Sequence, residues 1–457
     1  VYIRPDLTGI SFMAFDRAAD AVDKGEVAAR AQIDELRAFA SDAATWSAFK
    51  ARHHRRPAGE LHVDEVRIDN SSRLSEATVG SLLNLPGNQP FEQKGISAAV
   101  MRLKSMECFG MIRERFERAD GRGVLTLSTP PRPGSRGSLQ VGLALLGDTQ
   151  GSQEFNLIFR HQLLGLNRHA GEVQTILQLG QSMRASVEYY QPIDTALRWF
   201  VAPSVEGSRR NRQLWADGKA VSDYRMRHDQ VTVAAGRVFG SWGEVRLGAY
   251  TGNESETRTM GTVSPAEGDE ARGGFLARFS VDTLDHAVFP RHGTFVNLSF
   301  DQSSSTLRAD TDYQRAVLTA DHSFSWGPNT LQPRIMIGAN LDTGVSLANS
   351  FTLGGMGRLS GLGWDELIGE DAGVAGLVYY RRMAHLDIAA LQIRMFVGGT
   401  VEAGNVYDSG DPITVDSLRI SSSVFVGGDT PIGPVFLGWG LSEGGRDRFY
   451  FMLGQRF

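Results

Sequence analysis

The C-terminal two-thirds of the chain, residues 134–457, consists of short segments in which apolar and polar residues alternate. In residues 274–282, for example, most of the apolar side chains fall on one face, whereas Arg278, Ser280 and Asp282 share the other. A repeat of two residues is the period of a β-strand. Strands with one apolar and one partly charged face are typical of transmembrane β-barrels, whose side chains face lipid and lumen in turn. Because the pattern recurs about sixteen times, the sequence predicts a mainly β fold with a 16-stranded transmembrane β-barrel.

Each predicted strand and its loop average about twenty residues, which suits a membrane barrel. No stretch approaches 18 consecutive apolar residues, so the sequence contains no candidate transmembrane helix. A soluble sandwich or propeller would alternate in the same way. The end of the chain favours the membrane barrel, because in water so apolar a terminal strand would aggregate; one of its faces carries Phe449, Phe451, Leu453 and Phe457. The strands are expected to begin near residues 137, 153, 170, 185, 196, 220, 242, 272, 293, 311, 330, 373, 391, 419, 434 and 446.

The composition excludes several other classes of protein. Glycine accounts for 52 of 457 residues, about 11% against an average near 7%, while proline is scarce, and this argues against a disordered chain. The net charge is −5 and no basic helix with interleaved aromatic residues is present, so no nucleic-acid partner is expected. Cys108 is the single cysteine, and no Cys/His cluster has zinc spacing. We therefore expect no disulfide, no metal site and no cofactor.

Two smaller regions precede the predicted barrel. Residues 11–50 carry apolar residues at helical spacing and predict one or two helices, followed by a basic linker at residues 52–57. The next region predicts an α+β domain in the order β-α-α-β-β, with a turn at Asp120-Gly121. Its strands are expected at 61–68, 109–117 and 123–129, and its helices at 75–83 and 91–104. The predicted domains are thus residues 1–58, 59–133 and 134–457.

Two local motifs and the end of the chain carry a resemblance to a known family. Residues 282–293 (DTLDHAVFPRHG) form an Asp-rich turn with Phe-Pro and a glycine before a strand, and residues 396–406 (FVGGTVEAGNV) place an acidic residue between Phe and Gly in a late strand. Together with the terminal Phe457, they resemble the POTRA-plus-barrel superfamily of outer-membrane assembly and secretion proteins. The resemblance implies a barrel in the outer membrane of a Gram-negative bacterium, with a POTRA domain in the periplasm. It also implies that Phe457 is a terminal signal read by the barrel-assembly machinery, which would be a partner during biogenesis together with periplasmic chaperones and outer-membrane lipid.

The single predicted POTRA domain and the Ala-rich helices before it narrow the resemblance. They are similar to the patatin-like autotransporters of type Vd secretion (PlpD-type), in which an N-terminal lipase and the barrel share one polypeptide. This resemblance implies a translocator that exports its own N-terminal passenger, with residues 1–58 as the passenger's tail and linker, and it allows a homodimer. The alternative is a barrel-assembly insertase or a two-partner-secretion transporter that acts on separate proteins. A passive pore or receptor is a third possibility, but such a protein needs no POTRA domain.

A glycine-rich segment, residues 353–362 (LGGMGRLSGL), resembles the superfamily's sixth loop, which inserts into the lumen. The tip motif of that loop is an aliphatic residue, Arg, Gly and an aromatic residue. Here the tip departs from the motif, with Ser360 in place of Arg and Leu362 in place of the aromatic residue, and its residues are Arg358, Leu359, Ser360, Gly361 and Leu362. Arg358 is a substitute cation for acidic lumen residues, of which Glu402 and Asp285 are the candidates, or it is an ordinary exposed loop residue.

Enzyme motifs fail on their context. Residues 440–444 (GLSEG) match the G-x-S-x-G nucleophile elbow, but the residues after them alternate as a strand and include no histidine, so a hairpin turn is predicted. Residues 355–360 narrowly miss a dinucleotide-binding motif and lack the strand-helix unit around it. The Ser and Asp motifs of a patatin-like lipase are not found in residues 1–60. We therefore expect no enzyme activity from this chain, and a lipase passenger would have its catalytic part elsewhere.

Overall fold

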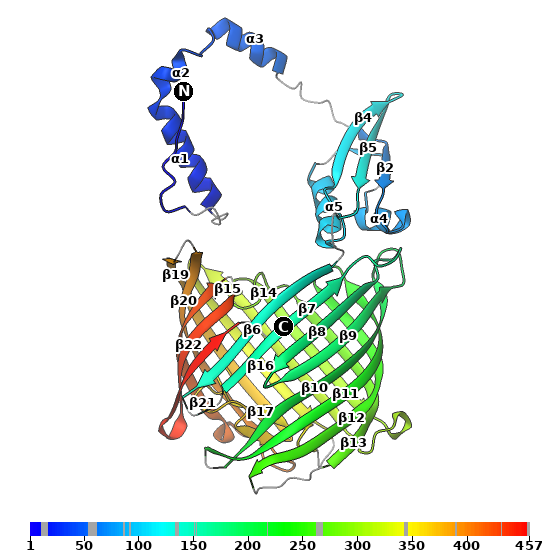
Figure 1. Cartoon of the computed structure of the whole chain (residues 1–457), viewed down its shortest axis with the longest axis vertical. Helices are drawn as coiled ribbons and strands as arrows, with labels where there is room; N and C mark the ends of the chain where they lie inside the picture. The colour runs from blue at the N-terminus through cyan, green and yellow to red at the C-terminus, as the bar shows by residue number, and fades with distance from the viewer. Residues whose placement is uncertain are drawn as a thin grey trace.

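The computed structural model consists of a β-barrel, a small α+β domain at one mouth of the barrel, and an N-terminal helical segment (Figure 1). Phe457 lies outside the residues that the structure describes, so its predicted role is considered below as a proposal. The described residues are 1–10, 17–53, 62–85, 87–90, 93–132, 137–149, 151, 153–216, 218–261, 268–341, 346–388, 391–430 and 432–454.

The barrel is closed and has sixteen antiparallel strands, each paired with its neighbours along the chain. The predicted starts of all sixteen strands lie within four residues of the observed ones. The prediction of a 16-stranded barrel is therefore confirmed. The strands are β6 (Gly137–Asp148), β7 (Gln153–Leu163), β8 (Glu172–Gly180), β9 (Met183–Pro192), β10 (Trp199–Ala216), β11 (Lys219–Phe239), β12 (Gly243–Gly261), β13 (Gly268–Asp282), β14 (Gly293–Ser303), β15 (Gln314–Trp326), β16 (Asn329–Asn340), β19 (Asp371–Ile388), β20 (Leu391–Tyr407), β21 (Arg419–Thr430), β22 (Gly433–Ser442) and β23 (Arg446–Leu453).

Alternation along each strand separates an apolar outer wall from a more polar inner wall. On β13, Phe275 is 53% exposed on the outside, whereas its neighbour Leu276 is 6% exposed on the inside. On β23, Phe449 is 54% exposed and Arg448 is 1% exposed. Both strands follow the predicted faces, as expected where lipid meets one side of a sheet and a lumen the other.

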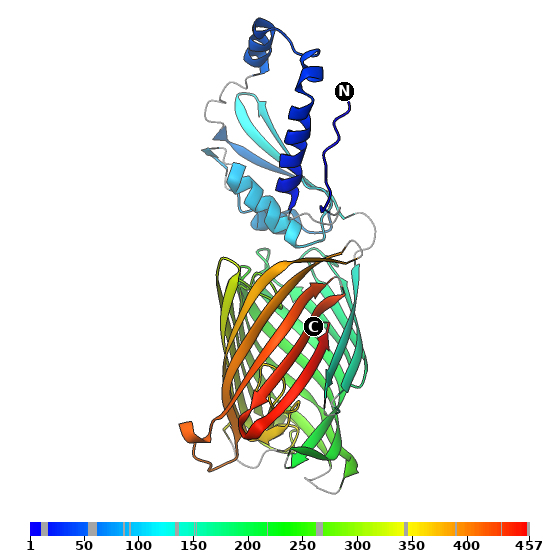
Figure 2. The same ribbon diagram turned by 90° about the vertical axis from the view of Figure 1, so that its left-hand side faces the viewer.

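The barrel closes where its last strand, β23, meets its first, β6. Among the described residues this seam is the shortest pairing: four residue pairs join Leu145–Asp148 to Tyr450–Leu453, whereas every other pair of adjacent barrel strands shares at least seven. Figure 2 shows β23 in red at the front of the barrel, beside the teal β6. Because backbone hydrogen bonds hold a barrel closed, we expect the seam, with the fewest described pairs, to be the weakest junction in the wall.

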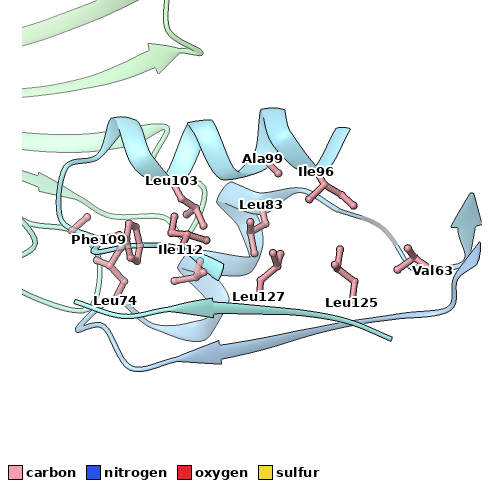
Figure 3. Close-up of a cluster of buried hydrophobic side chains, with 12 residues drawn as sticks. Val63, Leu74, Leu83, Ile96, Ala99, Leu103, Phe109, Ile112, Leu125 and Leu127 are labelled. Carbon is pink, nitrogen blue, oxygen red and sulfur yellow. The ribbon is translucent and has the colours of Figure 1, made fainter. Parts of the chain in front are cut away.

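The longer elements of the α+β domain follow the predicted order, and two unpredicted two-residue strands, β1 and β3, pair with each other beside them. Its sheet has the order β2-β5-β4, with β2 parallel and β4 antiparallel to the central β5. Two helices cover one face of this sheet, and Leu83, Leu103 and Leu127 lie at the centre of the core between them (Figure 3). The elements are β1 (His62–Val63), β2 (Glu65–Asn70), α4 (Glu76–Leu83), β3 (Gln89–Pro90), α5 (Gln93–Ser105), β4 (Arg113–Ala119) and β5 (Arg122–Thr129).

Local sequence explains the limits of these elements. The Oγ of Ser75 accepts a hydrogen bond from the Thr78 amide at 3.1 Å and caps the start of α4. Asp120 and Gly121 both have positive φ, at 52° and 79°, in the tight turn that joins β4 to β5. Such two-residue hairpins favour Asp-Gly because glycine adopts positive φ without a steric penalty.

The α+β domain is packed directly on the barrel. The amide of Ser75 donates to the carbonyl of Arg168 at 3.0 Å, in the turn between β7 and β8. Ala170 from the same turn is 3% exposed and belongs to the domain's core, and Leu197, from the turn between β9 and β10, packs against it. The barrel turns thus complete the apolar core of the domain and fix it at this mouth.

The N-terminal segment contains α1 (Ala18–Ala31), α2 (Ile33–Arg37) and α3 (Ala43–His53). The prediction of one or two helices was wrong in number, because the helical region is interrupted at Gln32 and again between Arg37 and Ala43. Neither α1 nor α2 has a buried residue, and Val22, Phe39 and Trp46 are exposed. The predicted linker lies mostly outside the described residues. None of the helices in the described part of the chain is long and apolar enough to cross a membrane.

Candidate functional site

The segment between β16 and β19 folds into the barrel. Its short strands β17 (Phe351–Leu353) and β18 (Leu367–Gly369) pair with each other, and β17 lies within the barrel outline, toward the end opposite the α+β domain (Figure 1). Leu353, Leu359 and Leu362 are at most 1% exposed and pack with Val374 of the barrel wall. We call residues 346–370 the inserted loop. The predicted position of a lumen loop therefore agrees with the geometry.

Glu402 on β20 holds the tip of this loop. Its carboxylate accepts hydrogen bonds from the amides of Leu359 (2.9 Å) and Ser360 (2.6 Å) and from the Ser360 hydroxyl (2.7 Å). Thr400, on the same strand, donates a further bond. Glu402 is 1% exposed, and a buried carboxylate needs such donors to balance the loss of hydration. The attachment therefore consists of neutral donors around one buried anion.

Two glycines let the loop tip lie directly on the wall. A side chain at Gly440 of β22 would place its Cβ 2.0 Å from the carbonyl oxygen of Ser360. A side chain at Gly361 would place its Cβ 2.2 Å from the amide nitrogen of Ser442. Both distances are far below van der Waals contact, so backbone packs against backbone here and glycine is required on both sides.

Arg358 and Asp285 do not anchor the loop in the predicted way. The Arg358 guanidinium donates to the carbonyl of Thr352 within the loop, whereas Leu359 and Ser360 supply the loop's donors to Glu402. Asp285 lies in the turn between β13 and β14, at the mouth that carries the α+β domain. There it accepts from the amides of Arg291 (2.7 Å) and His292 (3.1 Å). It therefore stabilises a turn, and Glu402 is the candidate that meets the loop.

A second attachment joins the loop to β23, beside the seam. Arg448 is 1% exposed and donates to Asp148 of β6 (3.1 Å) and to Glu366 of the loop (3.4 Å). Arg446 forms an ion pair with the same Glu366. The Tyr450 hydroxyl lies within hydrogen-bond distance of two loop carbonyls, at 2.9 Å and 2.6 Å.

This cluster was not predicted from the sequence. Alternation places Arg448 on the face opposite Phe449 and Phe451, and its side chain is buried on the inner side of the wall. Glu366 lies in an irregular loop without a period, so nothing in the sequence connected it to them. The inward-facing Arg448 on the last strand was the available signal, because a charge in a barrel wall needs a partner.

A turn folds inward near the opposite mouth. Phe289, in the turn between β13 and β14, is 4% exposed and stacks on Phe396 with ring centroids 4.0 Å apart. Phe425 and Phe436 complete the cluster, and the Tyr380 hydroxyl donates to the carbonyl of Pro290. The Phe-Pro motif therefore packs inward against β19–β22.

The other side of the inner wall is charged. Ion pairs connect neighbouring or nearby strands. Their side chains project into the lumen, as is typical of membrane barrels, whose interiors are polar. These pairs are Arg184 with Glu206, Arg246 with Glu188 and Arg272 with Glu254. Among the described residues, no group of three or more His, Cys, Asp or Glu side chains is placed to hold a metal ion.

The G-x-S-x-G match lies in the last hairpin, as predicted. Gly440 and Ser442 belong to β22, and a short turn at 443–445 leads into β23. The Ser442 hydroxyl is bonded to Ser421 and to the carbonyl of Ile420. It therefore belongs to the strand pairing of the wall and not to a nucleophile elbow.

Comparison with known proteins identifies the family. The sequence matches the Omp85 superfamily domain over residues 169–457, which is more than half of the chain. The chain belongs to the Omp85 superfamily. Its 16-strand barrel and its family imply an outer-membrane location in a Gram-negative bacterium and a fold of the translocator and insertase type. No curated protein matches the sequence.

Solved structures of this superfamily share the fold at low sequence identity. BamA from Haemophilus ducreyi lacking POTRA domains 1–3 is 12% identical, with a TM-score of 0.66 over 87% of this chain and 85% of that one. CdiB from Acinetobacter baumannii is 9% identical, with a TM-score of 0.54 over 86% and 74%. CdiB from Escherichia coli is also 9% identical, with a TM-score of 0.51 over 88% and 92%. At these identities the likeness establishes the fold alone.

Proposed function

We propose that this Omp85 protein is an outer-membrane translocator that exports its own N-terminal passenger, a patatin-like lipase, to the cell surface. The observation that carries the proposal is the α+β domain, the one such domain among the described residues, fixed on one mouth of the barrel through Ser75, Arg168 and Ala170. The helices α1–α3 are joined to this domain in one chain. A passenger fused ahead of them would therefore be delivered to the same mouth.

In this proposal residues 59–133 are a POTRA domain on the periplasmic side. Its edge strand β4 is exposed along most of its length, and a strand edge binds extended polypeptide by adding it as a further strand. The inserted loop keeps the lumen closed until export begins. No nucleotide is needed, because folding of the passenger outside the membrane supplies the driving force. Phe457 is proposed as the terminal signal for assembly of the barrel itself.

The second candidate is an insertase or two-partner-secretion transporter that acts on separate proteins. The likeness to BamA and to CdiB favours it, since the barrel and the docked domain are the parts that all these folds share. The proposals differ in one property: whether the cargo is covalently attached to this chain.

A fusion experiment separates the two candidates. An epitope-tagged segment is placed ahead of Val1 in the full chain, and cells that express it are probed with antibody before and after permeabilisation. Self-export predicts that the tag is accessible on intact cells and is lost from the surface on deletion of the barrel. The insertase proposal predicts that the tag stays periplasmic, while proteoliposomes containing the chain accelerate insertion of a separate unfolded barrel protein. A tag that stays inside would refute self-export.

A further inference from the structure

The same strand that closes the barrel also binds the inserted loop. Tyr450 pairs with Asp148 across the seam, and its hydroxyl reaches the carbonyls of Ser360 and Leu362 at the loop tip. The loop thus contacts one edge of the seam directly, through β23.

A buried charge network continues this contact across the seam. The side chains of Asp148 and Glu366 are 0% and 4% exposed, and Arg448 between them is 1% exposed. The Arg448 guanidinium also lies over the ring of Trp215, 5.3 Å from its centroid. Arg446 is 31% exposed and pairs with the same Glu366, so that two cations balance two anions. The three buried groups come from three structural parts: Asp148 from the first strand, Arg448 from the last strand and Glu366 from the loop.

We propose that Glu366, Arg448 and Asp148 form a clasp that couples the inserted loop to the seam. The loop remains in the lumen while the seam is closed, and withdrawal of the loop releases the seam. The proposal concerns the barrel alone, so it holds whichever cargo the protein carries.

The coupling acts through burial. A closed seam keeps Arg448 dry, and in a dry environment its bond to Glu366 is stronger than in water. When β6 separates from β23, water reaches the guanidinium. The bond between Arg448 and Glu366 then becomes weaker, and the loop is held less firmly. Conversely, when the loop leaves with Glu366, Arg446 loses its ion pair and Arg448 keeps Asp148 as its acidic partner, and the excess positive charge favours hydration of the seam. By linkage each movement must promote the other to the same extent.

Single-channel recording of the full chain in planar bilayers tests this coupling. Large-conductance events report withdrawal of the loop. The seam is locked by a disulfide between Gly147→Cys and Phe451→Cys, which face each other across it, in a Cys108→Ser background. Oxidation should lower the frequency of large events about tenfold, within the usual range of coupling between two sites, and reduction should restore it. A matched disulfide between Leu247→Cys and Ala277→Cys, opposite each other on β12 and β13, should have no effect.

Substitutions in the loop identify the groups responsible. Glu366→Gln should make large events frequent and remove their dependence on the seam disulfide. The matched control is Asp365→Asn, because the Asp365 carboxylate accepts from Thr352 inside the loop at 2.8 Å and does not reach the seam in the described contacts. If the Glu366→Gln variant does not fold, Arg448→Lys can replace it. This substitution keeps the positive charge but removes the planar set of guanidinium donors, and it should weaken the coupling partially. The proposal is overturned if locking the seam leaves large events unchanged, or if Asp365→Asn acts as Glu366→Gln does. Neither result depends on a passenger or a client protein. The proposal of self-export can therefore be refuted by the fusion experiment while the coupling of loop and seam still holds.

Discussion

Single residues decide how the loop is held. Glu402 receives its four described hydrogen bonds from two amides and two hydroxyls, which are neutral groups. A serine in place of arginine brings the loop backbone within reach of the carboxylate, and the backbone then supplies half of the donors. The cations of the site lie instead on β23, where they bind Glu366.

We predict that Ser360→Ala weakens the attachment less than Glu402→Ala. Removal of the Ser360 hydroxyl costs one hydrogen bond to a charged group, about 1.5–3 kcal/mol, together with the bond that it accepts from the Gly357 amide, and leaves both amide bonds to Glu402 in place. Glu402→Ala removes the acceptor of every described bond and leaves buried donors without a partner. The free energy of unfolding in detergent, measured for both variants with urea, checks the order. Equal losses for the two would mean that the amides contribute nothing.

Cys108 provides a natural probe of domain docking. Burial raises the pKa of its thiol to about 11, and a Cβ at Gly165, in a barrel turn, would lie 3.3 Å from the Cys108 Cβ. Because the thiolate is the reactive form, alkylation at pH 8 should be slow in the native protein and should rise steeply toward pH 11. Loosening the domain from the barrel, for example by Gly165→Val, should speed labelling at pH 8. Rapid modification of the native thiol at pH 8 would contradict a docked domain.

At the scale of elements, the sequence allowed the strands to be placed closely, because a repeat of two residues is local information. The strand starts near 137, 153, 293, 391, 419 and 446 were placed without error. The largest displacement, four residues, is at β13, which follows a stretch outside the described residues. The contacts of the inserted loop could not be placed in the same way. Glu366 and Arg448 lie 82 residues apart in sequence and meet only because the barrel closes.

The packing of the loop on β22 predicts an asymmetry between two glycines. Gly440→Ala would drive a Cβ into the Ser360 carbonyl, and backbone on both sides leaves no flexible group to yield. The loop tip should therefore be displaced, with an increase in open-pore conductance. Gly373→Ala on β19 is the matched control, because a Cβ there meets nothing within 4 Å. Similar conductance in the two variants would show that the tip is not held against β22.

The whole molecule combines a closed barrel wall with a loop that is folded into its lumen. Each barrel strand pairs with two neighbours, as the absence of water in a bilayer favours. The lumen is narrowed at both ends by inward-folded segments, the loop on one side and the Phe289 turn on the other. A protein that passes polypeptide must move at least one of these segments, and the loop, tied to the weakest junction, is the one whose release also loosens the wall.

Deletion of residues 354–363 tests this arrangement in the complete protein. The deletion removes the tip that fills the lumen but leaves all sixteen strands, so the barrel should still migrate differently in gels before and after boiling, as closed barrels do. Conductance should rise because the tip no longer occupies the lumen, and surface display of a fused segment should fall because the release step is lost. Identical migration of boiled and unboiled deletion protein would mean that the loop is needed to fold the wall. Unchanged conductance in a barrel that does fold would show that the loop does not close the pore.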